Sequence, residues 1–514
     1  MVVKVQPDDA TWDAGDVRYN VLRWTSSPNP PFGGYGPSFV NPKTGEILGA
    51  DIMLEYVHFT NRVKYNKIFG DISKASSEEE ARAIFTNENN FMYCSAGHLM
   101  HENTMFGKTV LAATGASDLE MEGMKREAMK SLIMHEVGHT LGLNHNMKAS
   151  QLFTPEQLAD PDFIKGKCLT GSVMDYAAIN LTLDRSKQGQ YYDTAVGPYD
   201  IWAIQYGYTP FKNRAEMDAL LAQSTKPELI FGNDADDMRS PGKAIDPRVM
   251  TGDLSNDQIK YSIDRIKLAN NMMKNIKQRF SKEGETYEEL RNAYYILNGQ
   301  AVRAGDVISR FIGGVYVDRA VSGQEGATKP YTPVSLADQK RAMEALKTYV
   351  FAPNAFKAPK DLYNYLARQR RGYNFFSGPE DPKIHAQVLS YQKRVLNHIL
   401  HRNTLQRISD SELYGNKYKL SSFMTDLNNA IFKADLYTNV NSFRQNLQTE
   451  YTKMLLKMVV GKSSSRYTNA SKAMALYNLK KIKTWSGNGL GNIATKAHKN
   501  QLKLLINNSL KEVK

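Results

Sequence analysis

Apolar residues recur at nearly helical spacing between Ser117 and Gly142. The apolar positions of this stretch are Leu119, Met129, Leu132, Ile133, Val137 and Leu141. Ser117 and Glu120 have the S-x-x-E spacing of a capping box, which marks the start of a helix. Gly142 is the residue type that most often follows the end of a helix. The pattern therefore predicts a helix over residues 118–141, buried on one side.

Two shorter stretches have equally clear patterns. Residues 49–59 alternate Ile52, Leu54 and Tyr56 with Asp51, Met53 and Glu55, which predicts a half-buried strand. Residues 197–208 begin with Pro198 in a first helical turn and place Ile201, Ile204 and Tyr208 on one apolar face. We expect a helix there.

The chain after Tyr208 is polar, charged and patterned as helices. Residues 261–280 carry an apolar stripe formed by Ile266, Ala269, Met273, Ile276 and Phe280. A cap at Ser335 and Asp338 precedes a second stripe formed by Ala342, Leu346 and Tyr349, and residues 421–432 and 449–460 have similar patterns. Residues 240–255 and 322–333 have the composition of surface loops. We predict one unit over residues 1–210 and a mostly helical region over 211–514, with room for two subdomains.

The predicted helix over residues 118–141 ends in the sequence MHEVGHTLGLNHN, which concentrates His135, Glu136, His139 and His145. His135 and His139 are four residues apart and therefore lie on one helical face, where both imidazoles can reach one ion. Gly142 can adopt positive φ and turn the chain back, so that His145 arrives as a third ligand. Three protein nitrogens leave one position open for water, as in a catalytic zinc site. Glu136 falls beside that position and is the candidate general base.

HEVGHTLGLNH resembles the long zinc-binding motif of the metzincin metalloproteases. GSVMDY, residues 171–176, resembles the Met-turn of that clan, with Met174 beneath the ligands. Tyr176 stands where some metzincins have a tyrosine that touches the metal or the tetrahedral intermediate, and its phenol would donate to an oxyanion. The resemblance implies an α+β fold in which a mixed twisted sheet and an active-site helix precede the mainly helical region. The stretch 49–59 resembles the ADIMI-like strand of matrixins, and residues 197–208, with Asp200, resemble the closing helix.

Most of the chain resembles the large bacterial secreted zinc-dependent metalloproteases. RYNVLRW (residues 18–24) is similar to the opening of their metzincin unit, and FIGGVYVDRA (residues 311–320) to a recurrent segment of their helical part. The resemblance implies a secreted, periplasmic or cell-surface protein, although MVVKVQPDDATWDAG lacks the apolar region of a signal peptide. Family members carry further domains ahead of this unit, which leaves upstream domains and a pro-segment open.

Composition indicates a globular protein with 41% hydrophobic residues and no apolar run long enough to cross a membrane. The net charge of +13 comes mostly from a basic tail that starts at about residue 451. We expect this tail to be a solvated helical face, and an anionic glycan or surface is the alternative partner. Nucleic acid is not expected, because no nucleic-acid module is recognisable. Whether Cys94 and Cys168 are bonded stays open.

The sequence predicts a zinc metalloendopeptidase with one catalytic zinc ion and a protein or peptide substrate bound along the sheet edge near residues 51–56. A gluzincin arrangement, with Glu156 as third ligand, is the alternative among enzymes. A different class is a zinc-containing binding protein whose basic helical region contacts an anionic glycan or surface. Cleavage preference, calcium sites and oligomeric state do not follow from the residues.

Overall fold

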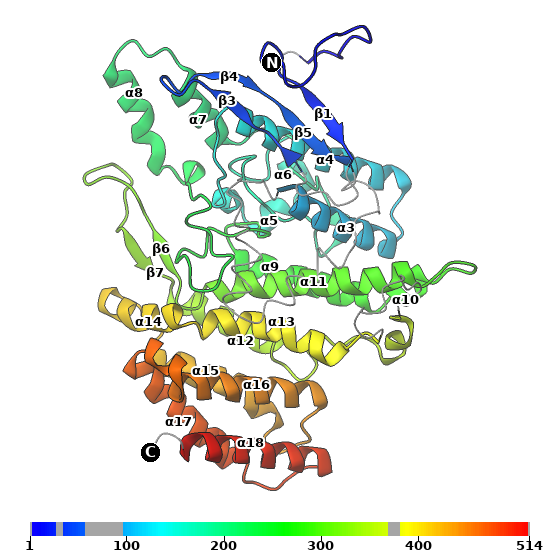
Figure 1. The fold of residues 1–514 in the computed structure, drawn as a ribbon, viewed down its shortest axis with the longest axis vertical. Coiled ribbons are helices and arrows are strands. Elements are labelled where there is room, and N and C mark those ends of the chain that lie inside the picture. The colour runs from blue at the N-terminus through cyan, green and yellow to red at the C-terminus, as the bar shows by residue number, and fades with distance from the viewer. Residues whose placement is uncertain (1–2, 27–33, 57–95, 368–380, 512–514) are drawn as a thin grey trace.

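The computed structural model describes residues 3–26, 34–56, 96–367 and 381–511. Most of its strands lie at one end of the molecule, beside helices α3 (Ala96–Thr114) and α4 (Asp118–Thr140). The helices from residue 258 onward follow in successive layers toward the C-terminus (Figure 1). The predicted α+β class is therefore confirmed, and the region after residue 211 is mainly helical. Within the described ranges, every helix is too short or too polar to cross a membrane.

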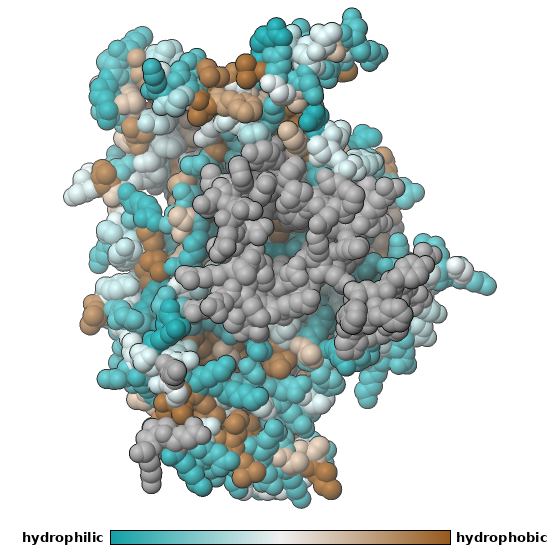
Figure 2. Space-filling model, viewed as in Figure 1, coloured by the Kyte–Doolittle hydropathy of each residue, from teal (hydrophilic) through white to brown (hydrophobic). Residues whose placement is uncertain are grey.

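The described strands are short and form three small sheets. Their bounds are β1 (Leu22–Thr25), β2 (Gly34–Tyr35), β3 (Ser38–Val40), β4 (Ile47–Ala50), β5 (Ile52–Glu55), β6 (Val315–Val317) and β7 (Tyr331–Pro333). In the mixed sheet, β5 lies between β1, which is parallel to it, and β2, which is antiparallel. β3 pairs with β4, and β6 with β7. Phe39, Val40 and Leu48 are exposed on β3 and β4, where Figure 2 shows hydrophobic residues at the surface.

The stretch predicted as one strand over residues 49–59 is broken at Asp51. The Asp51 carboxylate is buried and accepts a hydrogen bond from the backbone N–H of Val21 (3.0 Å). Ile52 and Leu54 are buried as predicted, whereas Tyr56 is 52% exposed, so its place in the core was wrong. Since β5 has described neighbours on both sides, it is not the free edge that we expected for a substrate. Residues 57–59 lie outside the described part of the chain.

The helix that carries the histidine motif is α4. It begins where predicted, because Ser117 Oγ accepts a hydrogen bond from the backbone N–H of Glu120 (3.2 Å). The Glu120 carboxylate accepts from Arg185 Nη2 (2.7 Å) and so anchors the first turn of α4 to a later segment. Leu132 is buried, but Leu119 is 84% exposed and does not belong to the apolar face. The face toward the core instead includes Met124 and Ala128.

The helix predicted over residues 197–208 is α7 (Pro198–Tyr208), with Pro198 at its start. Its predicted apolar face is wrong, because Ile201 and Tyr208 are 51% and 55% exposed. Asp200, by contrast, is buried. The helix is therefore held by its first turn and by Trp202, whose indole N–H donates to the carbonyl of Leu220 (2.9 Å).

The remaining helices include those that form the layers of Figure 1. Their bounds are α5 (Pro155–Leu158), α6 (Pro161–Ile164), α8 (Arg214–Leu221), α9 (Gln258–Met273), α10 (Ile276–Phe280), α11 (Glu288–Arg310), α12 (Leu336–Tyr349), α13 (Ile384–Ile399), α14 (Arg402–Ser411), α15 (Leu420–Phe432), α16 (Ser442–Val459), α17 (Asn469–Trp485) and α18 (Ile493–Lys511). The predicted cap of α12 is confirmed, since Ser335 Oγ accepts from the N–H of Asp338 (3.0 Å). Ile266, Ala342 and Leu346 are buried as predicted.

One hydrophobic core joins the ligand helix to the helical region. Phe106 and Met124, from α3 and α4, belong to the same buried cluster as Leu268 and Leu297, from α9 and α11. A division after residue 210 stays a prediction, and apolar packing crosses that position.

Residues 240–255 form no helix or strand, as predicted, but they are not a surface loop. Asp246, Met250, Asp253 and Leu254 are each at most 2% exposed. This segment passes beneath the histidine motif: the backbone N–H of Met250 donates to the carbonyl of Met147. The polar residues of this segment make buried hydrogen bonds, whereas a prediction from composition alone takes polar residues to be exposed to solvent.

Candidate metal centre

The end of α4 determines where the three histidines of the motif point. His135 and His139 lie one turn apart on the helix, which ends at Thr140. Gly142 has φ +88°, and the N–H of Leu143 donates to the carbonyl of Gly138 (3.0 Å) while that of Gly142 donates to His139 (3.0 Å). These are the two hydrogen bonds of a Schellman motif. The predicted turn at Gly142 is confirmed, and it carries the chain back past the histidine face.

The structure brings the three predicted ligands together. One ligand nitrogen from each of His135, His139 and His145 lies within 4.8 Å of the other two, so the group could hold a metal ion. The ring centroids of His135 and His139 are 4.9 Å apart, and those of His139 and His145 are 4.7 Å apart. Within the described ranges, this is the one such group found among histidine, cysteine and acidic side chains.

Hydrogen bonds fix which nitrogen of each ring faces the others. His135 Nδ1 lies 2.8 Å from the carbonyl oxygen of Val173, and His139 Nδ1 lies 3.1 Å from that of Leu143. His145 Nδ1 lies 2.7 Å from Oδ2 of Asp234. A carbonyl or carboxylate oxygen only accepts, so Nδ1–H donates in each case. In the neutral rings, the lone pair available to a metal is then on Nε2.

Burial keeps two of the imidazoles neutral. It lowers the pKa of His139 to about 4, with a smaller contribution from His145, and it lowers the pKa of His135 well below its ordinary value. His139 Nε2 is buried and has no hydrogen-bond partner in the described part of the chain. A buried polar atom without a partner is costly, and a metal ion at this point would remove that cost. The donor set therefore fits zinc, which binds imidazole nitrogen readily.

Glu136 lies on the same helix, between the two histidines in sequence, and is fully buried. The chain that continues from β2 passes directly over it. A side chain at Gly36 would come within 2.7 Å of the Glu136 carbonyl oxygen and 3.3 Å of its Oε2. Gly36 thus allows a backbone segment to cover the carboxylate closely. The residues just before β2, 27–33, lie outside the described part.

The predicted Met-turn lies beneath the ligand helix. Met174 is fully buried, and a methyl group at Gly138 would overlap its Sδ atom. The turn is tied to the start of α7 by Asp200, which accepts from Ser172 Oγ (2.5 Å), the N–H of Val173 (2.9 Å) and the N–H of Gly197 (2.8 Å). The methionine is therefore held against the helix backbone between the two helical histidines.

Tyr176 projects from the end of the Met-turn toward the third histidine. Its hydroxyl lies 3.0 Å from Nε2 of His145, the nitrogen that faces the other two rings. The phenol therefore stands at the rim of the histidine group. In that position it can donate a hydrogen bond to an oxyanion formed beside the group.

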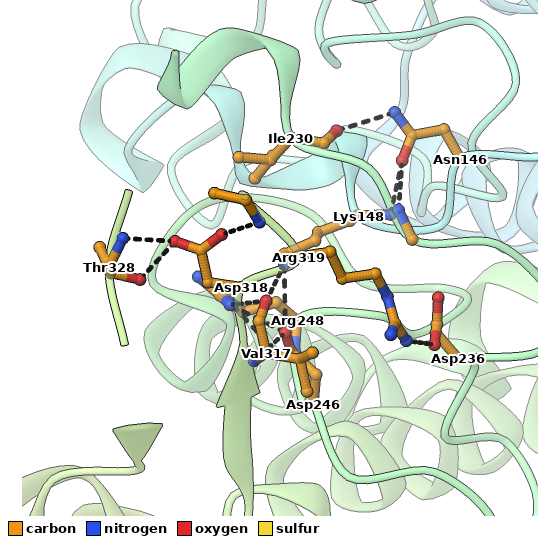
Figure 3. A network of polar contacts seen from close by, with 12 residues as sticks. Asn146, Lys148, Ile230, Asp236, Asp246, Arg248, Val317, Asp318, Arg319 and Thr328 are labelled. Carbon is orange, nitrogen blue, oxygen red and sulfur yellow. Dashed lines mark hydrogen bonds and ion pairs between the residues drawn. The ribbon is translucent and has the colours of Figure 1, made fainter. Parts of the chain in front are cut away.

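Asp234 was not identified from the sequence. It lies 89 residues after its partner His145, in a segment with neither helical nor strand pattern. The chain just after His145 is attached to the same segment, since Asn146 Nδ2 donates to the carbonyl of Ile230 (3.0 Å). Figure 3 shows this bond and the neighbouring polar network around Lys148 and Asp246. The only sequence signal was the acidic run NDADD, which is common in exposed loops.

Glu156, the alternative third ligand, lies on the surface. Its side chain is 68% exposed and pairs with Lys260 (3.3 Å). It is not part of the histidine group. The arrangement of α5 therefore does not support a gluzincin site.

Comparison with known families places this site in context. A family model described as Met-zincin matches residues 117–439, from the cap of α4 into the helical region and over more than half of the chain. Neither the curated proteins nor the solved structures contain a significant match. The match begins at the helix that carries the histidines and extends past Asp234, so it covers the whole candidate centre. The chain belongs to the Met-zincin family.

Proposed function

We propose that the protein is a zinc-dependent endopeptidase. The observation that carries the proposal is the convergence of His135, His139 and His145, each with its Nδ1 bonded to an acceptor, beside the buried carboxylate of Glu136. In this proposal the three Nε2 atoms hold one zinc ion. When bound, the ion would lower the pKa of a water molecule and polarise the scissile carbonyl group.

The protein groups supply proton transfer and charge stabilisation. Glu136 accepts the proton of the attacking water on its carboxylate and passes it to the nitrogen of the leaving amine. The covering segment at Gly36 limits the access of bulk solvent to that carboxylate, which strengthens its interactions. Tyr176 donates from its hydroxyl to the oxyanion that develops on the substrate.

The substrate is proposed to lie next to β2. Gly36 follows this strand directly and lies at Glu136, so a peptide beside β2 would reach the carboxylate. Extended peptides commonly bind by adding a strand to such a sheet. This placement replaces the strand 52–55, which lies between two described neighbours.

The proposal is tested by degradation of a denatured, unstructured protein, with the zinc content of each sample determined. The wild type is compared with Glu136→Ala, and Glu122→Ala serves as the control, because Glu122 lies on the same helix with a 51% exposed side chain. We expect the wild type and Glu122→Ala to cleave, and Glu136→Ala to retain zinc and lose at least about 100-fold in activity.

If the wild type holds zinc and does not cleave, the endopeptidase proposal fails. The alternative prediction, a zinc-containing protein whose basic tail binds an anionic glycan or surface, then becomes the better description. If the wild type binds no zinc, both are wrong.

A further inference from the structure

The three histidines differ in how they are held. His135 and His139 are on a helix, and their Nδ1 atoms face backbone carbonyls. His145 lies beyond the Schellman turn on irregular chain, and its Nδ1 faces the carboxylate of Asp234 at 2.7 Å. Of these three contacts at Nδ1, that of His145 is the one to a charged side chain, and His145 is the one ring of the three that lies outside the helix.

Asp234 is itself fixed by its surroundings. Its backbone carbonyl accepts from Lys243 Nζ (3.0 Å), and its second carboxylate oxygen lies 3.4 Å from Arg239 Nη2. Arg239 also pairs with Asp237, which is buried. The carboxylate is thus oriented from one side by a guanidinium and from the other by the imidazole of His145.

The segment that carries Asp234 is anchored to α11. Arg310, at the end of that helix, is 1% exposed and donates from Nε to the carbonyl of Met238 (2.7 Å) and from Nη2 to that of Arg239 (3.0 Å). The guanidinium of Arg239 lies 5.8 Å from the ring centroid of Tyr176. One segment, residues 234–239, therefore contacts both the third histidine and the tyrosine at the rim of the centre.

We propose that Asp234 is the positioning residue for His145, and that the segment 234–239 sets the metal affinity of the site. The inference rests on the proposed zinc site. A carboxylate that accepts from Nδ1–H orients the ring and makes the opposite nitrogen a better donor, and loss of such a partner typically costs about 10- to 100-fold in metal affinity. The helix and the Met-turn then supply only part of the site, and a segment anchored to α11 completes it.

The test measures the zinc dissociation constant of the full chain by competition with a chromophoric chelator. We expect Asp234→Ala to weaken zinc binding by about 10- to 100-fold, and Asp234→Asn to fall between Ala and the wild type, because the amide oxygen still accepts from Nδ1–H. The matched control is Asp236→Asn, which alters a carboxylate of the same segment that pairs with Arg319. It should bind zinc like the wild type.

A double-mutant cycle separates positioning from a general loss of stability. In a His145→Ala background, Asp234→Ala should change the dissociation constant by less than about twofold, because the ring that it orients is gone. The absorption spectrum of the cobalt-substituted protein should also shift in Asp234→Ala and not in Asp236→Asn. Thermal unfolding of the metal-free variants checks the fold, and Asp234→Asn remains the informative variant if Asp234→Ala does not fold.

Equal zinc affinity in the wild type, Asp234→Asn and Asp234→Ala would overturn the inference and leave the proposed function intact. An equal loss in the presence and absence of His145 would also overturn it, because the effect would then not act through that ring. A wild type that binds no zinc would instead refute the proposed function.

Discussion

Gly138 lies where the ligand helix meets the sulfur of Met174, one residue before His139. Because a methyl group there would overlap Sδ, Gly138→Ala requires the methionine to move. We expect the variant to lose about 1–3 kcal/mol in the free energy of unfolding, as overpacked cores do. The midpoint and slope of urea unfolding, measured for the zinc-free protein, provide the check.

Gly123→Ala is the matched control for that substitution. Gly123 is an exposed residue of the same helix, and a methyl group there would have no neighbour within 4 Å. Alanine is the better helix former, so this variant should gain up to about 1 kcal/mol. Equal stabilisation by both substitutions would show that the methionine does not pack against the helix backbone as described.

At the scale of elements, Asp200 joins two pieces of chain that local patterns treat as separate. Its carboxylate accepts hydrogen bonds from Ser172, Val173 and Gly197, and so attaches the Met-turn to the start of α7. Asp200→Asn keeps one acceptor oxygen and loses the charge and the second acceptor. We expect a loss of about 2 kcal/mol, the usual contribution of a hydrogen bond to a charged group, in chemical unfolding.

Asp218→Asn on α8 provides the reference for that change. The Asp218 carboxylate is 53% exposed and pairs with Arg214 on the surface, so its loss should alter the unfolding free energy by less than about 0.5 kcal/mol. If both aspartates behave alike, the three hydrogen bonds of Asp200 do not hold the Met-turn in place.

Local signals in the sequence predicted well where helices and turns begin and end. They predicted less well which side chains are buried and which distant segments meet. The cap at Ser117, the turn at Gly142 and the convergence of the histidines all depend on residues within a few turns of one another, and the structure has them as predicted. Tyr56 and Leu119 have the right periodicity but are exposed, because burial depends on which element covers them. Asp234 could not be predicted, since its contact joins two segments far apart in the chain with no shared pattern.

At the scale of the whole molecule, two buried carboxyl groups meet where residues 240–255 pass under the Met-turn. Ser150 donates from its backbone N–H to Asp175 (2.6 Å) and from its hydroxyl to Asp253 (2.8 Å). Burial raises the pKa of Asp253 to about 7, and burial together with the charge of Asp253 raises the pKa of Asp175 well above its ordinary value. The described residues provide neither carboxylate with an ion pair.

The sign of the resulting pH dependence follows from these raised values. The folded chain holds these protons to a higher pH than the unfolded chain, in which an aspartate titrates near 3.8. The stabilising contribution is therefore complete below about pH 4 and is lost as the pH rises toward 7. Asp253→Asn removes one of the two titrations and keeps an acceptor for Ser150. The free energy of unfolding of this variant, relative to that of the wild type, should therefore rise by about 2–3 kcal/mol from pH 5 to pH 8, because one pKa unit corresponds to about 1.4 kcal/mol.

Chemical unfolding of both proteins at pH 5 and pH 8 measures this gain. Asp257→Asn is the control, because Asp257 lies four residues further along the chain, caps α9 and pairs with Arg341 at the surface. The difference in unfolding free energy between Asp257→Asn and the wild type should be nearly the same at the two pH values. A gain for Asp253→Asn that does not depend on pH would contradict the raised pKa values of the pair.

The anchoring of Asp234 by Arg310 has a consequence for the order of events during synthesis. A growing chain acquires its three histidines and Glu136 long before the ribosome reaches the end of α11. Until Arg310 is in place, the segment proposed to orient His145 lacks the two hydrogen bonds from that guanidinium, and the third imidazole is held less firmly than the other two. Metal capture is therefore expected late, after most of the molecule has been made. In the proposed peptidase, such timing would delay activity until most of the chain has been made.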